Sequence, residues 1–116
     1  MSRQAQFFQY KIPSSVVNVV KSIIIDYDRR EGAINRSAIS GAVLARYIEL
    51  NSAIDKSLSD IEAGIRKYMI YDIVNGIGYE RSQINTLMSK NAYYRRRRKL
   101  IYDIAVDLSL LNKSQC

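Results

Sequence analysis

The sequence contains no histidine and no tryptophan, and its single cysteine, Cys116, is the last residue. Without histidine the chain lacks the commonest general base and the commonest zinc ligand. One cysteine can form neither an internal disulfide nor a cysteine-rich metal site, and we expect Cys116 to be an inert terminal thiol. We therefore expect no metal, no cofactor and no catalytic activity.

Long hydrophobic runs are also missing, since stretches such as Ile23-Ile24-Ile25 are far too short to cross a bilayer. No apolar segment with a cleavage site opens the chain, and the low cysteine count fits a reducing cytosol. Gly76-Ile77-Gly78 is not a phosphate-binding loop, because a third glycine and a preceding strand are missing. These absences predict a soluble cytoplasmic protein that is not an enzyme. We also expect no membrane binding, because the apolar face of the last, basic helix is needed to close the small domain.

Glycine and proline are scarce, with five and one residues respectively. Apolar residues instead recur at helical spacing over long stretches. The 116 residues are one domain's worth of chain, and 47% hydrophobic composition is typical of a globular protein. We therefore expect an all-α fold, with residues 1–116 forming one small domain of about five helices.

The N-terminal helices are expected within residues 14–75. Ser59 and Glu62 form the capping-box pattern Ser-x-x-Glu, which predicts that a helix starts there. Gly76 or Gly78 can end that helix in the left-handed conformation. The predicted helices cover residues 15–30, 37–58 and 59–75, whereas the first dozen residues, with Phe7, Phe8 and Tyr10, are either loose or a docking arm.

Residues 79–111 have the layout of a helix-turn-helix. A short helix from about Glu80 to Met88 is expected first. A turn over residues 88–91 follows, and Ser89 can cap a long basic helix that runs to about Leu111. This order of elements is typical of proteins that read DNA with their second helix in the major groove.

The net positive charge of the chain comes from a short window next to that helix start. Seven basic residues and no acidic residue lie between Arg81 and Lys99, while the rest of the chain has 11 of each, so this window carries the whole net charge of +7. A solvated face usually mixes both signs of charge. The concentration of excess cations therefore predicts a site for a polyanion.

Helical projection gives the arginines of residues 95–98 different roles. The apolar face of the helix's second half, projected back, places Tyr94 and Arg97 toward the core and Arg98 at the flank. The same projection turns three cations outward, toward phosphates or base edges: Arg95, Arg96 and Lys99. We expect Arg97 to pair with an acid or a carbonyl, whereas Tyr93 fits the core and a DNA contact equally well and Asn91 could simply start the helix. The predicted DNA-binding residues are Arg81, Ser89, Lys90, Asn91, Tyr93, Arg95, Arg96, Arg98 and Lys99.

The segment from Tyr93 to Leu100 consists of two tyrosines, four arginines, a lysine and a leucine. Ahead of it stand five shorter pieces, Tyr47–Leu50, Ala53–Leu58, Ile65–Tyr68, Ile84 and Leu87–Ser89. With these pieces, the chain from Arg46 to Leu111 resembles the small phage late-gene transcriptional activators of the ArpU/RinA type, whose C-terminal half looks like the region-four helix-turn-helix of bacterial sigma factors. The segment Tyr93–Leu100 is the most distinctive part of the resemblance.

This resemblance implies sequence-specific binding to double-stranded DNA and activation of phage late or packaging genes. It also implies contact with host RNA polymerase and a location at the nucleoid of a bacterial cell. Two alternatives remain open. One is the DNA-recognition subunit of a phage terminase, which would assemble as a ring. The other is a protein-binding regulator, whose partner would be acidic or an inhibitor encoded by a phage or genetic island.

Overall fold

A computed structural model describes residues 11–112 of the chain, so the predictions for Phe7, Phe8, Tyr10 and Cys116 lie outside the described residues. Within this part the chain forms five α-helices and two short 3₁₀ helices and no strand, which confirms the all-α prediction. The α-helices are α2 (Ser14–Ile25), α3 (Tyr27–Asn35), α4 (Gly41–Leu58), α5 (Arg66–Asn75) and α6 (Lys90–Asp107), and the 3₁₀ helices are η1 (Ala63–Ile65) and η2 (Tyr79–Arg81). None of these helices is both long and apolar enough to cross a membrane.

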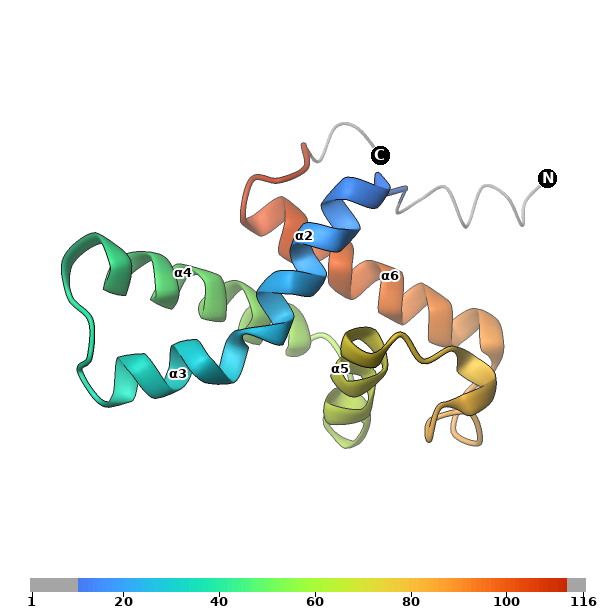
Figure 1. Cartoon of the computed structure of the whole chain (residues 1–116). Coiled ribbons are helices and arrows are strands. Elements are labelled where there is room, and N and C mark those ends of the chain that lie inside the picture. Colours follow the sequence, from blue (N-terminus) through green and yellow to red (C-terminus); the bar gives the residue numbers. More distant parts are fainter. Residues whose placement is uncertain (1–10, 113–116) are drawn as a thin grey trace.

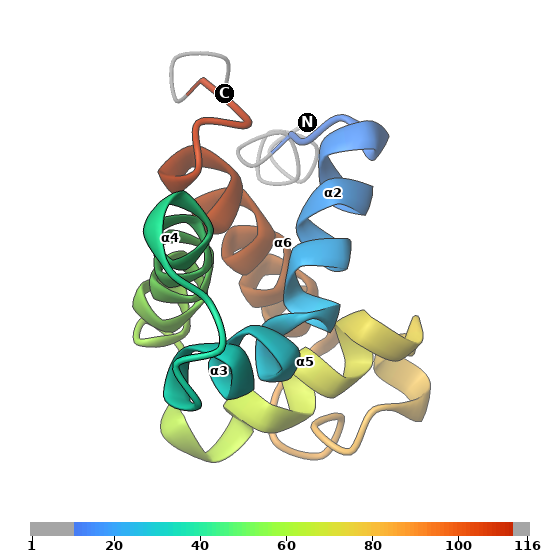
Figure 2. The same ribbon diagram turned by 60° about the vertical axis from the view of Figure 1, so that its left-hand side comes forward.

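The helices pack around α6, the long helix at the C-terminal end of the described chain. α2 crosses α6 and also packs on α5, and α4 lies against α6 from another side (Figures 1 and 2). α3 and α4 run antiparallel as a hairpin that extends away from the other helices (Figure 1). The segment between α5 and α6 lies beside the first turns of α6.

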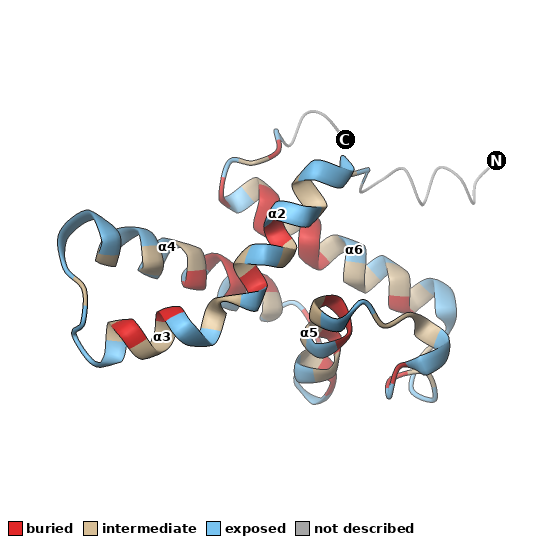
Figure 3. Ribbon diagram, in the orientation of Figure 1, coloured by how far each residue is buried: buried red, intermediate tan, exposed pale blue. Residues whose placement is uncertain are grey.

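The hydrophobic core lies where α2, α4, α5 and α6 meet. Figure 3 shows buried residues on the inner sides of these helices, whereas the outer end of the α3–α4 hairpin and the outer side of α6 are largely exposed. Burial of large apolar side chains is the main force that stabilises a fold of this size. The largest fully buried residues are Tyr93, Ile54, Met69, Ile84, Leu100, Ile104, Val20 and Asn51.

The helix predicted over residues 15–30 is broken at Asp26 into α2 and α3. Asp26 has φ −89° and ψ 6°, which takes the chain out of regular helix geometry, and its N–H donates to the Ile24 carbonyl. The guanidinium of Arg30 donates to the Ile23 carbonyl at the break. The Arg30 side chain thus supplies a hydrogen bond to a backbone carbonyl at the break between the two helices. The spacing of apolar residues contains no information on this contact, so it did not predict the break.

The capping box predicted at Ser59 is wrong. The Ser59 hydroxyl donates to the Lys56 carbonyl at 2.6 Å, so Ser59 closes the end of α4 instead of starting the next helix. Residues 63–65 form η1, and α5 starts only at Arg66. The predicted stop is confirmed, because Gly76 has φ 64° and ψ 33° and ends α5 in the left-handed conformation that glycine adopts without strain.

The short helix predicted over Glu80–Met88 is not formed as an α-helix. Only Tyr79–Arg81 are helical, as η2, and turns closed by Asn85 N–H to Ser82 O and by Leu87 N–H to Ile84 O follow. The Tyr79 hydroxyl donates to the Asn85 and Met88 carbonyls, and Ser82 donates to Asp72 on α5, so side-chain contacts replace regular helix hydrogen bonds in this segment. The second, basic helix of the predicted helix-turn-helix is therefore present as α6. The first helix, which a helix-turn-helix places three or four residues earlier, is not, and the α-helix that precedes α6 in the chain is α5, which ends at Asn75.

Candidate nucleic-acid interface

The first turn of α6 is fixed by Ser89. The Ser89 hydroxyl oxygen accepts the N–H of Ala92 at 3.2 Å, and its backbone is extended with φ −71° and ψ 162°. This is the geometry of an N-cap, and it confirms that Ser89 starts the helix. A contact between Ser89 and DNA stays a prediction, whereas its capping role is established.

Tyr93 is a core residue, so its predicted contact with DNA is wrong. Its side chain is 0% exposed, and its hydroxyl donates to the Asp72 carboxylate at 2.8 Å. Ser82 donates to the same carboxylate oxygen at 2.5 Å. Burial, and then the hydrogen bond to Asp72, raise the pKa of Tyr93 above its ordinary value. This buried network joins α5, the 76–89 segment and α6.

Arg97 belongs to the same network, as projection of the helix predicts. Its guanidinium donates to the Ile77 carbonyl and, at 2.9 Å, to the Tyr93 hydroxyl. The guanidinium carbon also lies 5.9 Å from the centre of the Tyr93 ring. Arg97 therefore holds the loop after α5 against α6, and its charge does not face solvent as a free group.

Asn91, Arg95 and Arg98 form an exposed stripe along α6. Their spacing of four and three residues puts the three side chains on one side of the helix. Among residues 11–112 none forms an ion pair with Arg95 or Arg98. The stripe extends about 10 Å along the helix axis, which is roughly the rise of three base pairs in DNA.

Arg81 lies at the end of η2, which packs on the start of α6. Tyr79 holds η2 in place: its hydroxyl donates to the Met88 carbonyl at 2.7 Å, and its N–H donates to the Tyr94 hydroxyl at 3.1 Å. Arg81 is exposed and, within the described chain, makes no ion pair. The packing of η2 on α6 thus places a third uncompensated cation at the same end of the molecule as the stripe.

The other three cations of the window are paired with acids that lie outside it. Lys90 Nζ is 2.9 Å from Glu80, and Arg96 Nε is 3.3 Å from Glu62. Lys99 Nζ lies 2.6 Å from Asp103 and 3.5 Å from Asp60. The folded chain thus brings acidic groups next to the basic window, so the local net charge there is less positive than the sequence of the window indicates.

Two of these ion pairs shift the pKa of one or both of their members. The hydrogen bond from Lys90 holds the pKa of Glu80 below its ordinary value, and the same bond raises the pKa of Lys90. The hydrogen bond to Asp103 raises the pKa of Lys99. Both lysines therefore stay charged at neutral pH. Exposed ion pairs of this kind contribute little stability, so a phosphate can replace the carboxylate.

Four acids that pair with cations of this surface were not identified as partners from the sequence, namely Asp60, Glu62, Glu80 and Asp103. The buried Asp72, which anchors Tyr93 and Ser82, was not identified either. Two of the ion pairs had a local signal in the sequence: Glu80 directly precedes the basic window, and Asp103 lies one helical turn after Lys99. Asp60 and Glu62 lie more than thirty residues from their partners, and only the approach of the α4–α5 connection to α6 brings them together.

The predicted site therefore separates into distinct groups. The residues that are exposed and form no ion pair in the described part of the chain are Arg81, Asn91, Arg95 and Arg98. Those that are exposed or half-buried and paired with an acid are Lys90, Arg96 and Lys99. Ser89 caps the helix, and Tyr93 is buried. Compared with protein-family models, curated proteins and solved structures, the chain has no significant match.

Proposed function

We propose that the chain binds double-stranded DNA through the outer side of the N-terminal half of α6 and the adjoining η2. The observation that carries the proposal is the set of three exposed guanidinium groups that form no ion pair with any of residues 11–112, in a chain with net charge +7, namely Arg81, Arg95 and Arg98. Arginine can clamp a phosphate or bridge a guanine with two hydrogen bonds. The major groove is wide enough to admit one α-helix.

Phosphate contacts and base contacts can be divided among these residues. Arg81 lies off the axis of α6, which suits a contact to the backbone of the duplex. Asn91 lies in the first turn of α6, where side chains of a groove-bound helix reach base edges, and an asparagine amide matches adenine. The three cations with exposed carboxylate partners can add phosphate contacts when those pairs open.

The more specific role we propose is that of a sequence-specific transcriptional activator of phage late or packaging genes. Its support is the resemblance of Tyr93–Leu100 to the basic segment of such activators. Within that segment the residues that face solvent, Arg95 and Arg98, are available for DNA, whereas Tyr93 and Arg97 maintain the fold. Host RNA polymerase would be the second partner in this role.

A salt titration of duplex binding tests the DNA-binding proposal. Fluorescence anisotropy should show the logarithm of affinity falling linearly with the logarithm of salt concentration. The double variant Arg95→Ala/Arg98→Ala removes two phosphate contacts, so the slope should become shallower by about 1.8. Circular dichroism should show unchanged helicity, because both side chains are exposed.

The matched control is Arg36→Ala/Arg46→Ala, which removes the same net charge from exposed positions on the α3–α4 hairpin. Its salt slope should stay close to that of the unmodified chain. If the two double variants weaken binding equally, the affinity depends on net charge alone and the assignment to α6 is wrong. Absence of duplex binding at low salt would reject the proposal altogether.

A further inference from the structure

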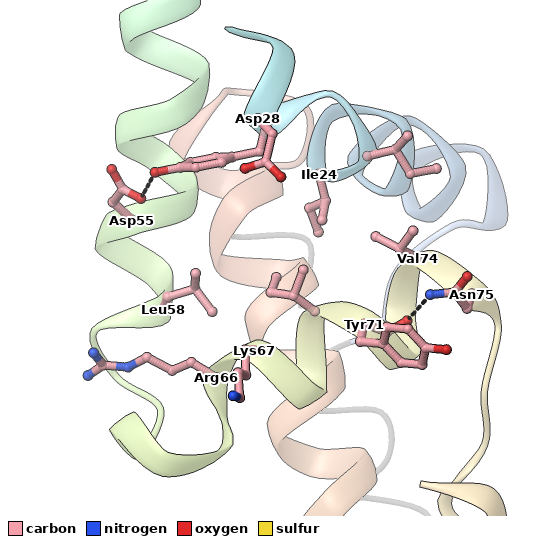
Figure 4. Close-up of a pocket in the computed structure, with 12 residues that line it drawn as sticks. Ile24, Asp28, Asp55, Leu58, Arg66, Lys67, Tyr71, Val74 and Asn75 are labelled. Carbon is pink, nitrogen blue, oxygen red and sulfur yellow. Dashed lines mark hydrogen bonds between the residues drawn. The ribbon is translucent and has the colours of Figure 1, made fainter. Parts of the chain in front are cut away.

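A groove with an apolar floor separates α5 from the junction of α2 and α3. It has a volume of about 550 Å³, and its apolar lining comes from Ile24, Ile25, Leu58, Ile70, Tyr71 and Val74. Figure 4 shows Ile24 and Val74 pointing into this space from opposite sides, and Leu58 closing it on the α4 side. The groove does not include any residue of the candidate nucleic-acid interface.

Two large apolar side chains stand exposed on the rims of the groove. Ile25 at the end of α2 is 52% exposed, and Tyr71 on α5 is 55% exposed. The Tyr71 ring lies on the α5 side of the groove in Figure 4. Exposed apolar groups that adjoin an apolar hollow are a feature of protein interaction sites, because both lose water contact when a partner covers them.

The two walls of the groove carry opposite charges. Asp28 and Asp55 lie on the α3–α4 wall, whereas Arg66 and Lys67 lie at the start of α5. Asp55 accepts a hydrogen bond from Tyr27 at 2.7 Å, and Arg66 donates to the Ile61 and Ser59 carbonyls. Within the described chain Asp28 and Lys67 form no ion pair, so each is available to a partner.

We propose that a second copy of this chain covers the groove, forming a dimer with a two-fold axis that runs along it. Such an axis brings the acidic wall of one copy over the basic wall of the other. Asp28 of each copy then faces Lys67 of the other, and the exposed Ile25 and Tyr71 side chains of each copy enter the opposing apolar groove. An interface of this type uses the same patch on both subunits.

Charge complementarity favours a second copy over an unrelated partner. The groove lining contains two acids and two bases and is neutral, so two copies can meet here although each chain has a net charge of +7. An unrelated helix would have to supply a matching pattern of opposite charges, whereas a two-fold copy supplies it by symmetry. The inference is independent of DNA binding, because no residue is shared between the two surfaces.

Sedimentation velocity on the full chain without DNA tests the dimer. The unmodified chain should form a concentration-dependent dimer. Asp28→Lys and Lys67→Glu should each weaken dimerisation by at least about a hundredfold, since two like-charge contacts replace two attractive ones. An equimolar mixture of the two variants should dimerise again, because each copy then presents the charge that the other lacks. Circular dichroism should show that both variants are folded.

An apolar pair of variants provides a second, independent measurement. Tyr71→Ser should weaken the dimer, whereas Leu87→Ser, which removes a side chain that is 65% exposed outside the groove, should leave it unchanged. A monomer at up to about 1 mM protein would overturn the inference. So would a ring of eight or more copies, a dimer indifferent to both charge reversals, or a mixture of the two charge variants that stays monomeric.

Discussion

Arg95 and Arg97 are two positions apart on α6 and have opposite surroundings. Arg95 is exposed and, in the described part of the chain, has no ion pair, whereas Arg97 donates to the Ile77 carbonyl and the Tyr93 hydroxyl. A turn of 200° around the helix separates the two side chains. Identical residue types in one short run consequently have different surroundings: Arg97 holds the fold together, whereas Arg95 is available to the DNA partner that we propose.

Replacing Arg97 with Ala should lower the free energy of unfolding by about 1–3 kcal/mol, because a partly buried carbonyl and hydroxyl lose their charged donor. Arg95→Ala should change stability by less than about 0.5 kcal/mol, since its side chain is exposed. Urea unfolding measures both values. Anisotropy with a DNA duplex should rank the two variants in the reverse order, and equal stability losses would show that α6 is rotated differently.

At the scale of elements, the segment between α5 and α6 is organised by side chains instead of by regular helix hydrogen bonds. Asn85 and Met88 offer carbonyls to the Tyr79 hydroxyl, and Ser82 donates to buried Asp72. These contacts come from α5, η2 and the residues before α6, so they form only when the elements pack together. Local periodicity therefore suggested a helix where tertiary contacts produce turns.

The Glu80–Lys90 pair links η2 to α6 and restrains a cation of the proposed interface. Glu80→Gln should free Lys90 for a phosphate and raise affinity for duplex DNA by about two- to fivefold, in line with the small strength of exposed pairs. Glu49→Gln is the control, since it makes the same charge change beside Arg46 on α4. Equal gains in the two variants would assign the effect to net charge.

The same pair gives a dependence of stability on pH with a defined sign. The folded pKa of Glu80 is lowered from its ordinary 4.5, so the pair's contribution is present above pH 4.5 and is lost as the pH falls through the folded value. Any difference in melting temperature between the unmodified chain and Glu80→Gln at pH 7 should therefore disappear in acid. A difference that does not shrink as the pH is lowered below 4.5 would contradict this assignment.

At the scale of the whole molecule, a buried polar cluster holds α3 against α4, and the Arg30 guanidinium ties this hairpin to α2 by donating to the Ile23 carbonyl. Arg30 is 3% exposed and Asn51 is 2% exposed, and Arg30 Nε donates to the Asn51 side chain at 2.6 Å. Asn51 in turn donates to Glu31 at 2.9 Å and to the Tyr27 carbonyl at 3.2 Å. Burial lowers the pKa of Arg30, yet its hydrogen bonds keep the guanidinium satisfied.

Replacing Asn51 with Ala should destabilise the whole protein by about 3 kcal/mol or more, because the buried Arg30 loses an acceptor. The neighbouring exposed variant Ser52→Ala should change stability by less than about 0.5 kcal/mol. Thermal and urea unfolding followed by circular dichroism compare the two. A small effect of Asn51→Ala would mean that the hairpin is held by its apolar contacts alone.

The sequence by itself determined the helical class, the core face of α6, the cap at Ser89, the stop at Gly76 and the inward turn of Arg97. All of these follow from helical periodicity or from the preferences of one residue, which act over a few positions. The tertiary structure alone decided that Tyr93 is buried, that the chain breaks at Asp26, and that Glu62 and Asp60 meet Arg96 and Lys99. Those outcomes depend on contacts between segments distant in the sequence, which no local pattern contains.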